Sequence, residues 1–79
     1  MHVTVKAKGI SVVGIPAEGL QVSVATGASA EDVLVVAGLA HDVGYLLALG
    51  EDALSPEEAK THPLVEGDVL TVLPPLRGG

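Results

Sequence analysis

Residues 68–79 read DVLTVLPPLRGG, and this stretch decides how the rest of the chain is organised. Its first half, residues 69–73, is a run of β-branched and aliphatic side chains, which is typical of a β-strand. Pro74 and Pro75 end the strand, because neither donates a backbone hydrogen bond and both favour an extended backbone. The stretch ends in two glycines, Gly78 and Gly79, which have no side chain to bury and the largest backbone entropy to lose. We therefore expect a strand that leads into a tail carrying a main-chain carboxylate.

The length of 79 residues allows one hydrophobic core. We expect a folded domain at residues 1–73 and a flexible tail at 74–79 that ends in Gly-Gly. A chain this short buries only about 60–65% of its surface, so its core must be strongly apolar. Valine and leucine supply such a core, since the sequence has no Phe, no Trp and a single Tyr.

Charge and composition exclude several classes of function. Ten acidic residues against four basic ones give a formal charge of −6, which disfavours binding to nucleic acid and to anionic membranes. The absence of cysteine from the sequence excludes disulfides, thiolate metal ligands and a thiol nucleophile. No apolar stretch approaches the roughly 20 residues of a membrane helix. The amino terminus also lacks the pattern of a signal peptide. We expect a cytoplasmic protein.

Two strands are predicted in the amino-terminal third. Residues 2–8 alternate between apolar and polar side chains, with Val3, Val5 and Ala7 on one face. Residues 20–25 alternate in the same way after a turn signal at 16–19. The two segments predict an antiparallel hairpin.

A helix is predicted at about residues 30–39. Ser29 can cap its first turn, and Glu31 and Asp32 lie where the helix dipole favours negative charge. Apolar residues recur with helical spacing and predict one buried face. That predicted face consists of Val33, Leu34, Val36, Ala37 and Ala40.

The carboxy-terminal half predicts a third strand at 45–49, a brief edge strand at 53–54 and a short helical turn that begins at Ser55. His62 and Pro63 end that turn, residues 64–65 return to the core, and residues 66–68 turn into the final strand. The predicted class is α+β, with a mixed sheet of four or five strands and one main helix packed on one face.

One helix covers only one face of such a sheet, so the other face meets water or a partner. In the final strand, Leu70 and Val72 should point toward the helix, whereas Thr71 and Leu73 should point away. We expect Thr71 and Leu73 to form a partner interface, with Leu73 and Leu76 making an apolar patch.

The chain resembles the MoaD/ThiS sulfur carriers over nearly its whole length. The resemblance lies in the order of the predicted elements, in residues 64–69 (LVEGDV) and in the ending 74–79 (PPLRGG). The small subunit of molybdopterin synthase is the closer match, although Val72 and Leu73 stand where that family often has aromatic residues. The last four residues are also similar to the ending of ubiquitin. The resemblance implies a ubiquitin-like β-grasp fold.

The resemblance also implies a reaction at Gly79. An adenylating enzyme of the MoeB/ThiF type would use ATP to activate the Gly79 carboxylate. A persulfide donor would then convert it to a thiocarboxylate, which serves a large synthase subunit or another sulfur acceptor. The carrier would have no catalytic side chain and no stably bound cofactor. The expected pathway is molybdopterin biosynthesis.

The tail would insert into a narrow channel of the partner. Pro74 and Pro75 would limit its slack, and Gly78 would allow close backbone approach. Leu76 would anchor the channel mouth, and Arg77 would contact an acidic residue of the partner.

Other functions stay open at the level of sequence. The chain could be a ubiquitin-like modifier joined through Gly79 to lysines, a carrier in thiamine or another sulfur pathway, or an interaction subunit with an incidental Gly-Gly. A metal site is not expected, because His2, His41 and His62 lack ligand spacing. The neighbours His41 and Asp42 could form an acid–base pair, but no nucleophile accompanies them.

Overall fold

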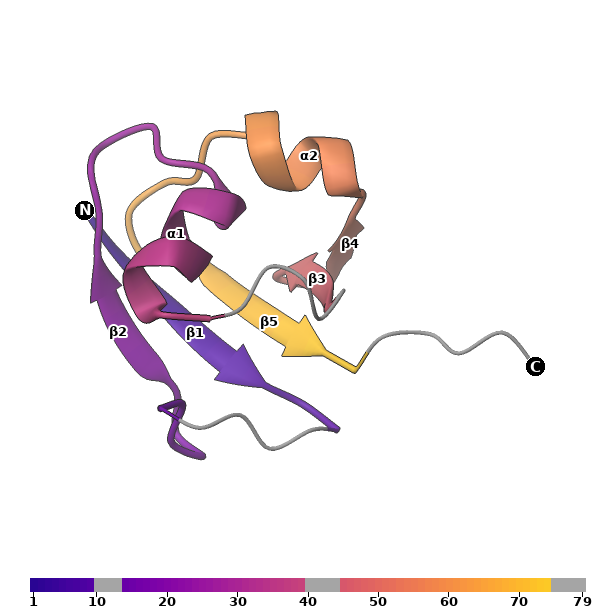
Figure 1. Ribbon diagram of the computed structural model, residues 1–79. Helices are drawn as coiled ribbons and strands as arrows, with labels where there is room; N and C mark the ends of the chain where they lie inside the picture. Colours follow the sequence, from indigo (N-terminus) through magenta and orange to yellow (C-terminus); the bar gives the residue numbers. More distant parts are fainter. Residues whose placement is uncertain (10–13, 40–44, 75–79) are drawn as a thin grey trace.

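The computed structural model describes residues 1–9, 14–39 and 45–74 (Figure 1). Within these residues the protein is of the α+β class, with a five-stranded mixed sheet and two helices. The elements in chain order are β1 (His2–Ala7), β2 (Leu20–Ser23), α1 (Ala30–Ala37), β3 (Leu46–Leu49), β4 (Asp52–Leu54), α2 (Pro56–Thr61) and β5 (Val69–Leu73). The predicted class and the predicted strands are confirmed, and α2 is a complete short helix.

The sheet has the strand order β2-β1-β5-β3-β4. Strand β5 lies in the middle, parallel to β1 and antiparallel to β3 (Figure 1). Antiparallel hairpin partners complete the two sides, β2 beside β1 and β4 beside β3. The last strand in the sequence is therefore hydrogen-bonded on both of its sides.

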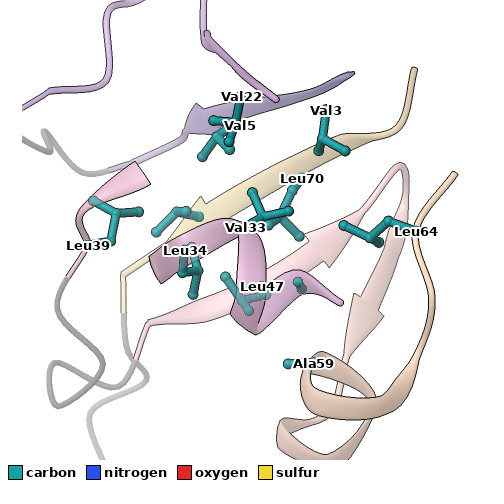
Figure 2. Close-up of a cluster of buried hydrophobic side chains, with 12 residues drawn as sticks. Val3, Val5, Val22, Val33, Leu34, Leu39, Leu47, Ala59, Leu64 and Leu70 are labelled. Atoms are coloured by element: carbon teal, nitrogen blue, oxygen red, sulfur yellow. The ribbon is translucent and has the colours of Figure 1, made fainter. Parts of the chain in front are cut away.

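The core lies between the sheet and α1. Register places Val5 beside Leu70, and Leu47 beside Val72, on the covered face of the sheet. Val33 of α1 packs over this layer and is fully buried, as Figure 2 shows for its position near Leu70. The whole core is aliphatic and consists of Val3, Val5, Val22, Ala30, Val33, Leu34, Leu39, Leu47, Ala59, Leu64, Leu70 and Val72. The alternation of burial along β5 matches the predicted faces of that strand.

Local sequence signals fix both ends of α1. The Ser29 hydroxyl accepts a hydrogen bond from the Asp32 backbone N–H, and the Asp32 carboxylate accepts one from the Ser29 N–H (3.0 Å). This reciprocal capping satisfies backbone donors that have no partner within the helix. At the other end, Gly38 adopts a left-handed conformation (φ 78°), which glycine allows without a steric cost. Ser55 and Glu58 repeat the reciprocal cap at α2.

Two residues predicted to enter the core are exposed. Val36 is 59% exposed, because the buried stripe of α1 runs through Ala30, Val33 and Leu34. At about 100° per residue, Val36 lies on the flank of that stripe. Ala40, the other end of the predicted face, lies outside the described residues.

Val65 is 62% exposed, whereas its neighbour Leu64 is 2% exposed. Successive residues of an extended segment point in opposite directions, so only one of the two can enter the core. Val65 also opens the tight turn before β5, where its N–H donates to the Asp68 carboxylate (2.8 Å).

Candidate functional site

The start of β5 is fixed to β1 by a compact turn. The Asp68 N–H donates to the Val65 carbonyl (3.1 Å), which closes the turn. The Gly67 N–H donates to the His2 carbonyl (2.9 Å), and the Asp68 carbonyl accepts from the Thr4 N–H (2.9 Å). These bonds set the register of β5 at the centre of the sheet.

An exposed contact between His2 and Glu66 lies at the same end of the sheet. The His2 backbone N–H donates to the Glu66 carboxylate (3.0 Å), and the His2 ring nitrogen Nδ1 lies 3.6 Å from the other Glu66 oxygen. Because both side chains are well exposed, water screens this pair and its contribution to stability is small.

The end of β5 is held beside the end of β1. The Lys8 N–H donates to the Val72 carbonyl (3.0 Å), one residue past the end of β1. Gly9 follows with a left-handed backbone (φ 74°). A Cβ atom built on Gly9 would lie 3.6 Å from Cδ of Pro74, which is ordinary contact distance. The bond from Lys8 thus holds β5 at Val72, two residues before the exposed Pro74.

The sheet surface opposite α1 is the candidate contact surface, and we call it the open face. It is defined by the residues that alternate with the buried ones. These residues are His2, Thr4 and Lys6 of β1, Gln21 and Ser23 of β2, Leu46 and Ala48 of β3, Ala53 of β4, and Val69, Thr71 and Leu73 of β5.

The open face is apolar around the end of β5. Register pairs Leu73 with Leu46 and Thr71 with Ala48 on the β3 side. Leu46 is 37% exposed, and Thr71 and Leu73 are half-buried. On the β1 side, register places the exposed Lys6 beside Thr71. An apolar centre flanked by a cation suits contact with another protein surface.

The described residues contain no cluster of three potential metal-ligating side chains. No buried side-chain polar atom among the described residues lacks a hydrogen-bond partner. The open face offers a surface of exposed and half-buried side chains for contact.

The structure places only part of the predicted site. Thr71 and Leu73 lie on the open face, and Pro74 is exposed at its edge. Their roles in partner binding stay predictions. The other predicted residues, Pro75, Leu76, Arg77, Gly78 and Gly79, lie outside the described residues, as do His41 and Asp42.

Sequence reasoning did not identify Leu46 as a site residue. The segment at 45–49 is apolar throughout, so no alternation marks which side chains lie on the open face. The pairing of β3 with β5 supplies that information, because Leu46 lies opposite Leu73.

A hollow lies on the helical side of the sheet, between α1, α2, β3 and β4. Its volume is about 280 Å³, and its apolar walls include Leu34, Leu47 and Leu54. Glu31 and Lys60 contribute one charge of each sign to its lining. It has no predicted site residue in its lining.

No helix within the described ranges has the length and apolar character needed to cross a bilayer. Comparison of the chain with protein family models, with curated proteins and with solved structures found no match.

Proposed function

We propose that the protein is a sulfur carrier of the MoaD/ThiS type, with a ubiquitin-like β-grasp fold and a thiocarboxylate formed at Gly79. The observation that carries this proposal is the position of β5. The strand that precedes the PPLRGG segment is the central one of the sheet order β2-β1-β5-β3-β4, paired in parallel with β1. This order, with a helix between β2 and β3, supports assignment to the β-grasp fold. Fold alone does not establish function, so the reactive end is the feature to test.

The central position of β5 suits a carrier. Pairing with β1 and β3 fixes the strand on both sides, and the hydrogen bond from the Lys8 N–H to the Val72 carbonyl holds its end. For a partner that docks on the open face, the residues after β5 would therefore start from a fixed position. Less conformational freedom is lost on insertion when the start of the tail is already held.

The proposed chemistry uses the main chain of the carrier. The Gly79 carboxylate attacks the α-phosphate of ATP and releases pyrophosphate, which gives an acyl-adenylate. A persulfide on a partner attacks the acyl carbon and releases AMP, which leaves an acyl disulfide. A thiol reductant then cleaves the S–S bond, so that the sulfur stays on Gly79 as a thiocarboxylate.

The proposed partners are an ATP-dependent activating enzyme, a persulfide donor and a large synthase subunit or other sulfur acceptor. Thr71, Leu73 and the neighbouring Leu46 would form the contact with the activating enzyme. We assign the product to molybdopterin biosynthesis on the resemblance alone, and the protein to the cytoplasm, where ATP is available.

Intact mass spectrometry tests this function. One sample is the full chain isolated from its native cells. A second sample is purified full chain incubated with the activating enzyme of the same cells, ATP and a persulfide donor. We expect a mass gain equal to the replacement of one oxygen by sulfur, located at Gly79 by fragmentation. A chain that continues past Gly79 in its mature form contradicts the proposal.

A variant that lacks Gly79 is the matched control. It should fold as the parent does, by circular dichroism, and should not support sulfur transfer. Retained sulfur transfer argues against the proposal. Gly-Gly remnants on lysines of other proteins would instead identify a modifier. If neither the sulfur gain nor these remnants is found, the interaction subunit is the alternative that remains.

A further inference from the structure

The sheet has two edge strands, β2 and β4. In β2, the outward backbone groups can be assigned from the pairing with β1. Met1 and Val24 exchange two hydrogen bonds, from the Val24 N–H to the Met1 carbonyl (2.9 Å) and from the Met1 amine to the Val24 carbonyl (2.7 Å). Hydrogen-bonded pairs alternate along an antiparallel ladder, so Val22 also bonds toward β1. The N–H and C=O groups of Gln21 and Ser23 therefore face away from the sheet.

The two edges differ in their protection. Strand β4 is three residues long, begins at the exposed Asp52 and is followed by Ser55 and Pro56, which start α2. Short length, charge and proline are the features by which proteins prevent pairing at an edge. Strand β2 is also short, but the stretch 20–24 (LQVSV) contains no charge and no proline. Within the described residues, β2 is therefore the edge strand that carries neither feature.

A groove of about 510 Å³ lies directly beside the end of β2. Its lining includes Ser23 and Val24 of the strand end, Ala28 of the following loop, and Val36 of α1. Val36 is the valine that the helical stripe leaves 59% exposed. The α1 side of the groove is thus formed by the apolar Val36 and the acidic Asp32, and the other side by residues 23–28.

The groove carries charge of one sign. Asp32 is the only charged residue in its lining among the described residues. One Asp32 oxygen accepts hydrogen bonds from the Ser29 N–H (3.0 Å) and the Ser29 hydroxyl (3.2 Å), so the carboxylate is held in place at the groove. An occupant with a basic residue would complement it, and an acidic occupant would be repelled.

We propose that the edge of β2 and the adjoining groove bind an extended, basic-flanked apolar segment of a partner protein as an added strand. The backbone of that segment pairs with Gln21 and Ser23. Alternate apolar side chains enter the groove against Val36, and a flanking Lys or Arg lies near Asp32. Strand β1 lies between this edge and Leu73 of β5, so the proposal stands whether or not the sulfur-carrier function holds.

The probe is an acetylated peptide of sequence Lys-Val-Thr-Val-Thr-Val-Lys, titrated into the isotope-labelled full chain and followed by NMR. We expect saturable shifts centred on the amides of Gln21 and Ser23, with slowed hydrogen exchange at both. A peptide with glutamate in place of both lysines should bind at least about fivefold more weakly.

Two pairs of variants separate the proposed contacts. Gln21→Pro removes the outward N–H, which an edge position tolerates, and should abolish binding, whereas Gln21→Thr keeps the N–H and should bind. Val36→Ser should weaken binding about fivefold, whereas Val35→Ser should not. Val35 is the matched control because it is 60% exposed on the same helix and is not part of the groove lining.

Several results would overturn the proposal. One is the absence of saturable binding by folded parent protein, and another is binding that Gln21→Pro leaves intact. Equal affinity for the lysine and glutamate peptides would remove the charge argument. Concentration-dependent shifts of the same amides without peptide would show that a second copy of the chain is the occupant.

Discussion

Leu46 of β3 and Leu73 of β5 lie opposite each other on the open face, at the point where the chain leaves the sheet. The two residues are distant in sequence and become neighbours because β3 pairs with the last strand. Leu46 remains 37% exposed in this arrangement. The pair therefore provides apolar contact area next to the origin of the tail.

The first prediction concerns this pair. Leu46→Ser combined with Leu73→Ser should raise the KM for the activating enzyme about tenfold, because a desolvated apolar contact at the interface is lost. The measurement is ATP–pyrophosphate exchange as a function of carrier concentration. Val65→Ser is the control, since Val65 is also an exposed apolar residue but precedes the opposite end of β5. An equal effect of both changes would mean that the pair is not a contact surface.

The second prediction concerns the core. Leu70→Ala should lower the free energy of unfolding by about 3 kcal/mol, because Leu70 is fully buried at the centre of the sheet. A chain of 79 residues has a total stability of about 4–12 kcal/mol, so the variant should be marginal. Urea unfolding followed by circular dichroism measures the change. Val35→Ala on the exposed side of α1 should change the stability by less than about 0.5 kcal/mol.

Much of the fold could be predicted because its signals are local. The alternation in β1 and β5 follows directly from burial on one face of a sheet. The starts of both helices follow from Ser29 and Ser55, whose hydroxyls cap the backbone three residues further on. These features depend on residues that are close in the sequence, so they can be predicted without knowing the tertiary packing.

The errors fall where burial depends on distant packing. The phase of α1 could not be fixed from spacing alone, because Val33 and Val36 are both compatible with one helical face. Packing of α1 against the rest of the core buries Val33 and leaves Val36 exposed. Leu46 was not identified for the same reason, since its role depends on its pairing with Leu73.

The candidate site was predictable only in part. Side chains alternate between the two faces of a strand, so the sequence alone predicts that Thr71 and Leu73 lie on the face opposite Leu70 and Val72. The reaction proposed at Gly79 rests on the resemblance to the sulfur carriers, and residue 79 lies outside the described residues. No local physical signal fixes what binds the tail, because that depends on a partner surface.

The third prediction compares two glycines with left-handed backbones. Gly27→Ala should cost about 1 kcal/mol in the free energy of unfolding, because φ is +84° but no atom lies within 4 Å of the added Cβ. Gly19→Ala should cost about 2–3 kcal/mol, because φ is +102° and the Cβ would also lie 2.9 Å from Cγ2 of Thr4. The β-branched Thr4 side chain has little freedom to move away. Urea unfolding measures both losses in the free energy of unfolding. Equal losses would show that the Thr4 side chain moves away from the added Cβ.

The last prediction concerns acid sensitivity at α2. The pKa of Glu58 is held below its ordinary value of 4.5, chiefly by the hydrogen bond from the Ser55 backbone N–H (3.0 Å). The Ser55 hydroxyl contributes next, and His62 adds a weaker attraction. A carboxylate whose pKa is lower in the folded state stabilises that state at pH values above the unfolded value. That contribution disappears as the pH falls below 4.5 and through the folded pKa.

We therefore expect the Ser55 and Glu58 amide signals to move together, and the start of α2 to loosen, as the pH is lowered past 4.5. NMR titration of the labelled chain measures both changes. Glu58→Gln is the matched control, because the amide oxygen still accepts the Ser55 bond but does not titrate, so the same signals should stay nearly constant. A midpoint above 4.5 for the parent, or an unchanged titration in the variant, would show that another group controls this end of α2.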